Sequence, residues 1–170
     1  MKHQKFILKL ILLFLVLSNI KSVLSQEDGL LKKTKSQKKL TETKQLYLQG
    51  NIKTALLNYK EIIALNPSSA KAHFGIAGCY YKLHNYYKSK YHAEIAEKNN
   101  PKVSEDLYYL MGEIYFRLGE LKKSKSSYEK FISEINSKQK IKEYLIDLKL
   151  SQLSFAQEEL MKSNKKIIIS

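Results

Sequence analysis

The chain has few of the residues that cross-link or interrupt a fold. One cysteine in 170 residues excludes an internal disulfide framework, and it excludes a zinc or iron–sulfur site built from cysteines. Two prolines and six glycines are fewer than the many turns of an all-β sandwich or barrel need. The scarcity of turn residues therefore favours long helices.

Arginine is almost absent, although the chain is basic. Of the 30 basic residues only Arg117 is an arginine, and the formal net charge is +14. Readers of bases and phosphates usually rely on the bidentate guanidinium group, which lysine lacks. The positive charge is therefore a weak indication of nucleic-acid binding, and no nucleic-acid partner is expected. An excess of lysine over arginine is typical of the codon usage of an AT-rich genome.

Residues 1–25 have the three-part pattern of a secretory signal peptide. Two lysines precede an apolar run over residues 6–17, which only Lys9 interrupts, and Val23-Leu24-Ser25 ends in a small residue. The apolar run is too short for a comfortable bilayer span, which needs about 20 residues. We therefore expect an exported protein whose mature chain begins at Gln26. The alternative is an uncleaved N-terminal membrane anchor.

Residues 26–35 are predicted to be a basic linker. The lysines between Lys32 and Lys39 crowd this part of the chain, and such runs of like charge are usually solvated. They also suggest a second function, in which these lysines and those near the C-terminus bind acidic polymers or a membrane surface. Binding of that kind weakens steeply with salt, which distinguishes it from binding by apolar groups.

Three segments of the chain align as an internal repeat, over residues 49–67, 83–101 and 118–136. The spacing is 34 residues and then 35, which is typical of stacked helical repeats. Equivalent positions hold Gly50, His84 and Gly119; Ala55, Ser89 and Ser124; and Pro67, Pro101 and Asn136.

Each repeat reads as two antiparallel helices. In the second repeat His73, Ile76, Ala77 and Tyr80 form an i, i+3, i+4, i+7 stripe, and Pro101 cannot continue the second helix. The third repeat has the same stripe, made by Tyr108, Met111, Gly112 and Tyr115. Small residues such as Gly112, Ala55, Ser89 and Ser124 allow the two helices of a pair to approach closely.

This pattern resembles the tetratricopeptide repeat family over residues 36–138, with repeats at 36–69, 70–104 and 105–138. The first repeat departs from the pattern, because Lys39 and Glu42 stand where an apolar residue is usual, so its first helix is expected to fray or to use its lysine stems. The resemblance implies an all-α, right-handed helical solenoid with a concave groove. The function it implies is protein–protein binding without catalysis.

A capping helix is predicted for residues 139–162, because a stack of repeats leaves its last face uncovered. Its packing stripe is expected to comprise Ile141, Tyr144, Leu145, Leu148 and Phe155. The tail at 163–170 contains three consecutive isoleucines before Ser170, which have the character of a strand without a partner.

The sequence contains no catalytic motif. His3, His73, His84 and His92 lack the HExxH spacing of a helical metal site, so the last three are expected to be structural. Cys79 follows the small residues Ala77 and Gly78 and is expected to be a buried apolar residue. We therefore expect neither an enzyme nor a small-molecule substrate, metal or cofactor.

The concave groove of the family is lined by the first helix of each pair, which identifies candidate binding residues. Their rings and basic flanks suit a peptide or helix with apolar anchors and some acidic residues, unless the rings only cover the core. The candidates are Leu40, Lys44, Tyr47, Phe74, Tyr81, Lys82, Tyr109, Glu113, Phe116 and Arg117.

One subclass of the family is excluded by its groove residues. Members that grip the acidic C-terminal tail of chaperones use Lys, Asn and Arg at five places. The matching residues are Leu40, Lys44, Gly75, Asp106 and Leu110, of which only Lys44 fits.

The order of segments also resembles the N-terminal part of a type of Bacteroidota envelope protein. In that type a signal peptide and a short tetratricopeptide module are followed by a β-propeller and a domain similar to outer-membrane protein A. The expected place of action is therefore the periplasm or cell envelope of a Gram-negative bacterium.

Overall fold

The computed structural model describes residues 34–135 and 138–169. The chain divides into two compact units, Met1–Thr41 and Glu42–Ser170, and each is described by itself. The predicted signal peptide, the start of the mature chain at Gln26 and most of the basic linker lie outside the described residues.

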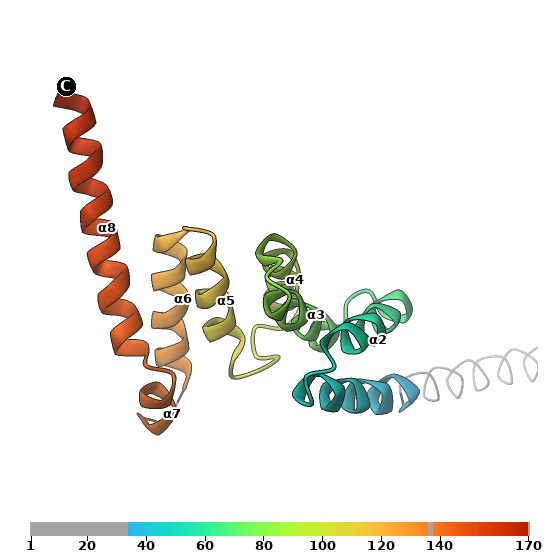
Figure 1. The fold of residues 1–170 in the computed structure, drawn as a ribbon. Helices are drawn as coiled ribbons and strands as arrows, with labels where there is room; N and C mark the ends of the chain where they lie inside the picture. The colour runs from blue at the N-terminus through green and yellow to red at the C-terminus, as the bar shows by residue number, and fades with distance from the viewer. Residues whose placement is uncertain (1–33, 136–137, 170) are drawn as a thin grey trace, which may run out of the picture. The chain divides into compact units, whose positions relative to one another are not determined.

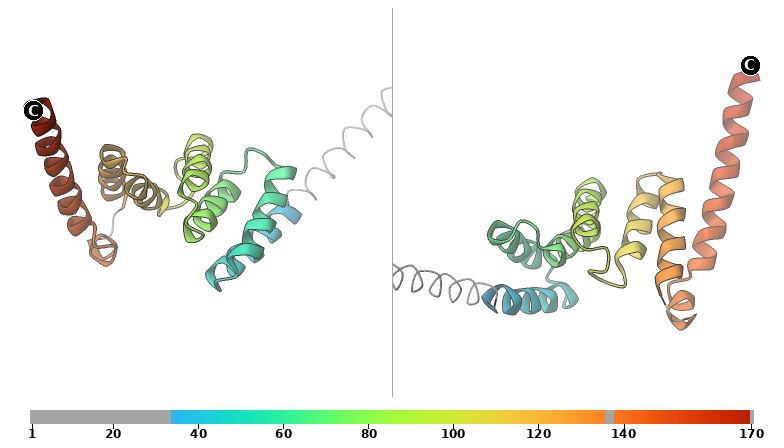
Figure 2. Two further views of the ribbon diagram at one scale, coloured as in Figure 1. Left: turned by 45° about the horizontal axis from the view of Figure 1, so that its top comes forward. Right: turned by 180° about the vertical axis from the view of Figure 1, so that it is seen from behind.

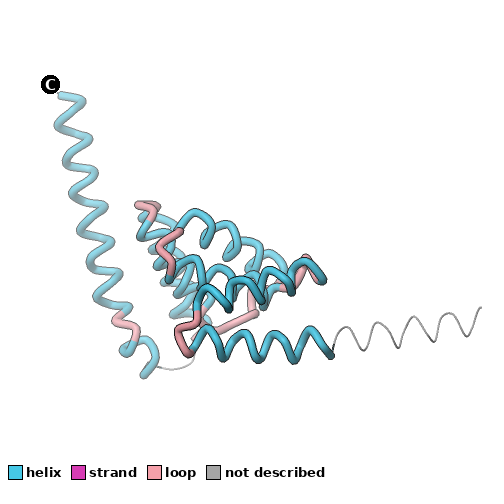
Figure 3. The backbone as a smooth tube through the Cα atoms, turned by 45° about the vertical axis from the view of Figure 1, so that its right-hand side comes forward, coloured by secondary structure: helices cyan, strands magenta, loops and turns pink. Residues whose placement is uncertain are grey.

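The described residues are helical, without strands, as the resemblance implied (Figures 1 and 3). Residues 34–48 are helical throughout, so the polar residues at Lys39 and Glu42 do not interrupt this helix. The helices that follow are α2 (Ile52–Leu65), α3 (Ala70–Lys82), α4 (Tyr86–Asn99), α5 (Leu107–Arg117), α6 (Leu121–Glu134), α7 (Lys138–Glu143) and α8 (Ile146–Ile169).

The three turns between paired helices are built in the same way. Gly50, His84 and Gly119 have φ values of 84°, 57° and 73°, in the left-handed region that ends many helices. At each turn the residue after it donates its N–H to a carbonyl five residues back, as Asn85 does to Tyr80 over 2.9 Å. His84 thus adopts the left-handed conformation for which the other two repeats have a glycine at the same position.

Within a pair, the helices approach closely at small residues. Ser89 Oγ donates to the Ala77 carbonyl over 2.7 Å, and Ser124 Oγ donates to the Gly112 carbonyl over 2.8 Å. A Cβ atom at Gly112 would lie 2.5 Å from the Tyr128 ring, so no larger residue fits there without a shift. The structure confirms the close approach that the sequence predicted.

Neighbouring helices in the chain are also neighbours in space. In the second unit α3 packs on α2 and α4, α5 packs on α4 and α6, and α8 packs on α6 (Figure 2). Aromatic residues of α5 and α6, such as Tyr108 and Phe131, form one core cluster with Ile146 and Leu153 of α8. The solenoid is therefore closed at its C-terminal side by α8.

The C-terminal segment differs from the single capping helix that was predicted. It is two helices, because Leu145 has a φ of 52° and breaks the chain between α7 and α8. Ile141 and Tyr144 pack against the core as expected, but Leu145, Leu148 and Phe155 are exposed. The predicted stripe was wrong because its helical period was extended across this break.

The tail is also helical where it is described. α8 continues to Ile169, whereas the isoleucines were expected to have the character of a strand. A strand needs a partner for its backbone groups, and a helix satisfies the same groups within itself.

Candidate functional site

The first helices of the second and third pairs, α3 and α5, present one surface together with the start of α8, which we call the first-helix face. A row of polar contacts crosses it. Tyr81 of α3 donates its hydroxyl to Glu113 Oε2 of α5 over 2.9 Å, and Lys149 of α8 forms an ion pair with Glu113 Oε1. These contacts join residues 32 and 36 positions apart in the chain.

Glu113 is the centre of this row. The residue is 9% exposed, and Oε1 also accepts a hydrogen bond from the Tyr128 hydroxyl over 2.6 Å. Burial by itself raises the pKa of Glu113, but the hydrogen bonds from Lys149, Tyr128 and Tyr81 outweigh it and hold the pKa below its usual value. Glu113 is therefore an ionised carboxylate that fixes two tyrosine rings and one lysine.

An aromatic cluster lies beside this carboxylate. The Tyr109 ring lies 4.2 Å from that of Tyr144 and 5.8 Å from that of Phe131, measured between centroids. Asp106 accepts a hydrogen bond from the Tyr144 hydroxyl over 3.0 Å. Tyr109 and Glu113, which the sequence placed in an open groove, are thus engaged by the C-terminal segment.

Other predicted groove residues remain accessible. Phe116 is 40% exposed, and the charged residues Lys44, Lys82 and Arg117 are exposed as well. Phe74 and Tyr81 are half-buried against the core cluster.

Two candidates of the first repeat lie differently. The Tyr47 ring packs on Gly78 of α3, where a Cβ atom would lie 3.2 Å from the tyrosine hydroxyl. Leu40 belongs to the unit Met1–Thr41 and lies in the helical residues 34–48.

α8 adds apolar side chains that the sequence assigned to the core. Leu148 is 53% exposed, and Phe155 is 66% exposed two turns further along the same side of the helix, which is opposite the side of the buried Ile146 and Leu153. The seven-residue spacing of Leu148 and Phe155 shows that they share one side of the helix. The sequence alone does not show which side of α8 is covered.

Two histidines of the second repeat form a pair that the sequence did not indicate. His73 Nδ1 and His92 Nδ1 are 2.9 Å apart, and His73 Nε2 lies 2.9 Å from the Pro67 carbonyl oxygen. Burial, and then the neighbouring His73 and Lys60, lower the pKa of His92 to about 4. This pair is a structural contact between α3 and α4.

The described residues hold no group of three or more histidine, cysteine, aspartate or glutamate side chains that converge as metal ligands. Cys79 is buried, and burial raises its pKa to about 12, so its thiol stays protonated at neutral pH. Within the same described residues, no helix has the length and apolar character that crossing a membrane requires.

No protein-family model and no curated protein matches the sequence. Solved structures match the fold of this chain. Their sequence identities to it are low, so the likeness shows a shared fold and no more. The chaperone SycD of Yersinia enterocolitica type III secretion, in complex with a peptide of the translocator YopD, has a TM-score of 0.62 at 15% identity, over 71% of this chain and 93% of that one.

Two further matches are domains named for their tetratricopeptide repeats. The first such domain of Spaghetti (RPAP3), bound to the HSP90 peptide SRMEEVD, has a TM-score of 0.62 at 18% identity over 72% of this chain and 93% of that one. The Sgt2 domain of Aspergillus fumigatus has a TM-score of 0.61 at 20% identity over 75% of this chain and 82% of that one. The chain therefore has the fold of tetratricopeptide repeat domains, an all-α helical solenoid.

Proposed function

We propose that the chain is a non-catalytic protein-binding module that holds a peptide or helix of a partner against its first-helix face. The observation that carries the proposal is the fixed, partly exposed aromatic surface around Glu113. The carboxylate holds the Tyr81 ring in place before any partner arrives, which reduces the entropy lost on binding. Two neighbours in fold, SycD and RPAP3, have been solved with bound peptides, which supports this use of the fold.

The exposed residues define the partner's chemistry. Phe116 on α5 offers apolar surface, and Lys82 and Arg117 add positive charge at the ends of α3 and α5. α3 carries two lysines and no acidic residue. A peptide with apolar anchors and some acidic residues fits these side chains.

The acidic tail of a chaperone is not the partner we propose. Gly75 faces the Tyr59 ring of α2, and Asp106 already accepts a hydrogen bond from Tyr144. Neither position offers the cationic or amide group that gripping such a tail uses.

The place of action we propose is the periplasm or cell envelope of a Gram-negative bacterium, and the N-terminal pattern of residues 1–25 supports it. The alternative is an N-terminal anchor that keeps the module at a membrane. The resemblance to Bacteroidota envelope proteins stays a prediction.

The experiment is a pull-down from envelope extract, followed by titration of the recovered partner. Phe116→Ala is expected to weaken binding by about 2 kcal/mol, because exposed aromatic anchors carry much of the energy of such interfaces. Lys122→Ala, at the start of α6, is the matched control and is expected to change binding little. Equal losses from both variants, together with loss of binding in high salt, would favour the binder of acidic polymers instead.

A further inference from the structure

Two lysines from neighbouring helices meet over the ring of Tyr80 on α3. Lys60 Nζ of α2 and Lys88 Nζ of α4 each lie 5.6 Å from the centroid of this ring. We call these three residues the Tyr80 surface. Successive residues of a helix are turned by about 100°, so Tyr80 and Tyr81 point to different sides of α3. The Tyr80 surface is therefore separate from the first-helix face.

The Tyr80 surface has hydrogen-bond donors and lacks an acceptor. Tyr80 is 9% exposed, its hydroxyl makes no hydrogen bond to the described part of the chain, and its oxygen is not fully covered. Lys60 and Lys88 are exposed, and neither forms an ion pair with a described residue. Two ammonium groups and one hydroxyl thus remain available to an acceptor from outside the chain.

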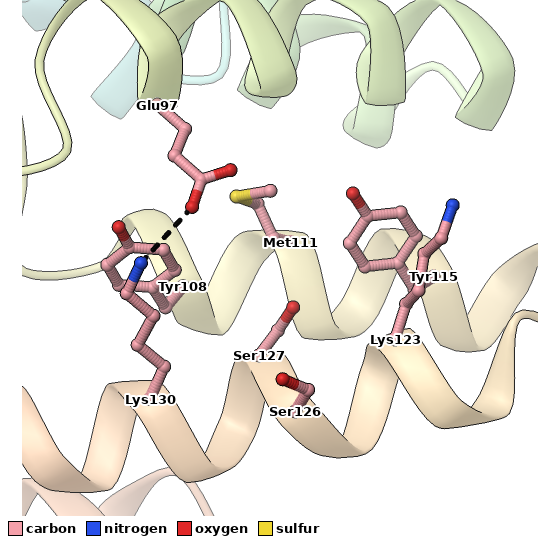
Figure 4. Close-up of a pocket in the computed structure, with 8 residues that line it drawn as sticks. All are labelled: Glu97, Tyr108, Met111, Tyr115, Lys123, Ser126, Ser127 and Lys130. Atoms are coloured by element: carbon pink, nitrogen blue, oxygen red, sulfur yellow. Dashed lines mark hydrogen bonds and ion pairs between the residues drawn. The ribbon is translucent and has the colours of Figure 1, made fainter.

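The third repeat contains a similar ring whose lysines do have an acceptor. Tyr115 lies 35 residues after Tyr80, and Lys123 lies 35 residues after Lys88. Lys123 Nζ lies 5.4 Å from the centroid of the Tyr115 ring (Figure 4), and a second lysine, on α4, lies 5.8 Å from it. The carboxylate of Glu120 bridges the two ammonium groups at 2.8 Å and 2.6 Å. A carboxylate is therefore the group that this chain itself places between two such lysines.

The acidic residues of the third repeat are replaced at the aligned positions of the second. The Tyr115 hydroxyl donates to Glu94 Oε1 over 3.1 Å, but the residue 34 positions before Glu94 is Lys60. The residue 35 positions before Glu120 is Asn85, whose side chain is uncharged. The second repeat thus keeps a tyrosine with two lysines over its ring, while a cation and an amide replace the two carboxylates. This excess of positive charge favours an anionic group from a partner.

We infer that the Tyr80 surface binds an aspartate or glutamate side chain of a partner protein. The carboxylate accepts hydrogen bonds from the Lys60 and Lys88 ammonium groups, as Glu120 does from its two lysines, and from the Tyr80 hydroxyl. Hydrogen bonds between charged groups are stronger than neutral ones, and this gives the contact its specificity for an acid. The inference goes beyond the proposed function and does not depend on the first-helix face.

Exposed apolar side chains beside the lysines favour a protein over a free ion. The Tyr91 ring is 61% exposed and lies 5.1 Å from the His92 ring, which stacks on Tyr80 at 5.8 Å between centroids. Leu57 is also 61% exposed and precedes Lys60 by one turn of α2. An acidic residue with apolar neighbours in its own chain therefore fits this surface on both sides of the carboxylate.

The test follows nuclear magnetic resonance signals of the purified chain at one fixed pH near neutral. The imidazole C–H signal of His92 reports on the Tyr80 surface, because its ring stacks on Tyr80. The methyl signal of Met161, next to Lys162 on α8, reports general attraction of acids to exposed lysines. The probe is an acetylated and amidated peptide of two leucines and two glutamates. We expect it to shift the His92 signal saturably, with a dissociation constant on the order of 1 mM, and to leave the Met161 signal in place.

Two further probes define what the surface recognises. The same peptide with glutamine in place of glutamate is expected to bind at least about tenfold more weakly, because it lacks the charge. A larger His92 shift with inorganic phosphate than with the acidic peptide would overturn the inference, and so would the absence of a saturable shift at about 10 mM peptide. Phe116→Ala is expected to leave the His92 shift unchanged, so this result and that of the first-helix face stay distinguishable.

Two matched variants test the surface from within the chain. Lys60→Glu supplies the carboxylate that the third repeat has at Glu94, so the midpoint of thermal unfolding is expected to rise by roughly 2–4 °C while the peptide binds at least about tenfold more weakly. Lys98→Glu makes the same change of charge in the last turn of α4 and is expected to lower the midpoint slightly and leave binding within about twofold of the wild type. Equal weakening by both variants, or an equal fall of both midpoints, would contradict the inference.

Discussion

Replacing Glu113 by glutamine tests the centre of the first-helix face. The amide keeps the size of the side chain but removes the charge that Lys149, Tyr128 and Tyr81 share. Hydrogen bonds to a charged group contribute about 1.5–3 kcal/mol and neutral ones about 1 kcal/mol. Because the partners here are buried to different degrees, we expect a total loss of about 2–3 kcal/mol in the free energy of unfolding, measured by urea denaturation.

A control variant shows whether the loss comes from these particular contacts. Glu129→Gln makes the same chemical change at an exposed pair, in which Lys125 Nζ lies 4.0 Å from the carboxylate. Exposed pairs of this kind contribute about 0.5 kcal/mol or less. Equal stability of Glu113→Gln and Glu129→Gln would refute the reasoning that Glu113 is a buried, ionised acceptor.

The pH dependence of the same variant gives a second check. The pKa of Glu113 is lowered in the folded protein, so its contribution is present above the unfolded value of 4.5 and is lost as the pH falls through the folded value. Below about pH 4.5 the wild type is therefore expected to lose its advantage over Glu113→Gln. An advantage that persists unchanged at lower pH would show that the carboxylate's charge does not stabilise the fold.

Three further predictions concern packing, pH and export. Ala55→Leu is expected to lower the free energy of unfolding by about 1–3 kcal/mol, because Ala55 is fully buried between paired helices; an unchanged urea midpoint would count against this close approach. The pKa of His92 is lowered from 6.5 to about 4 in the folded protein, so the unfolded chain binds a proton first and stability is expected to fall as the pH drops from 6.5 toward 4. The loss is at most about 3 kcal/mol, and His92→Gln should flatten this slope in urea unfolding at several pH values. N-terminal sequencing of the exported protein is expected to read from Gln26, whereas an intact Met1 in a membrane pellet would indicate an anchor.

The helix pairs were predictable because each rests on a short-range pattern. A stripe such as His73, Ile76, Ala77 and Tyr80 defines one helix face from a few neighbouring residues, and the turn at His84 follows from its alignment with Gly50 and Gly119. These signals lie within one repeat, so they do not depend on how the repeats stack. The all-α solenoid is confirmed by the structure and by its neighbours in fold.

The contacts of the site were less predictable because they join distant residues. Glu113 was expected on the groove, but its bonds to Tyr81, Tyr128 and Lys149 depend on how three other helices lie against α5. The buried face of α8 was not predicted, because it depends on the backbone conformation at Leu145. No sequence motif indicates the positive φ of that residue.

The surroundings of Tyr108 show the same limit. The sequence shows only a tyrosine on an apolar stripe, whereas the position of Lys130 Nζ, 4.0 Å from the centroid of its ring, depends on how α6 packs on α5.

Site-specific photo-cross-linking in envelope extract tests the central claim most directly, because it reports which surface a partner touches. A photoreactive phenylalanine is placed at Phe116 on the first-helix face or at Lys122 on α6. The proposed function predicts a cross-linked protein from position 116 and none from position 122, with the yield at 116 maintained in high salt, since apolar contacts are not screened. Equal cross-linking from both positions, lost from both in high salt, would contradict it.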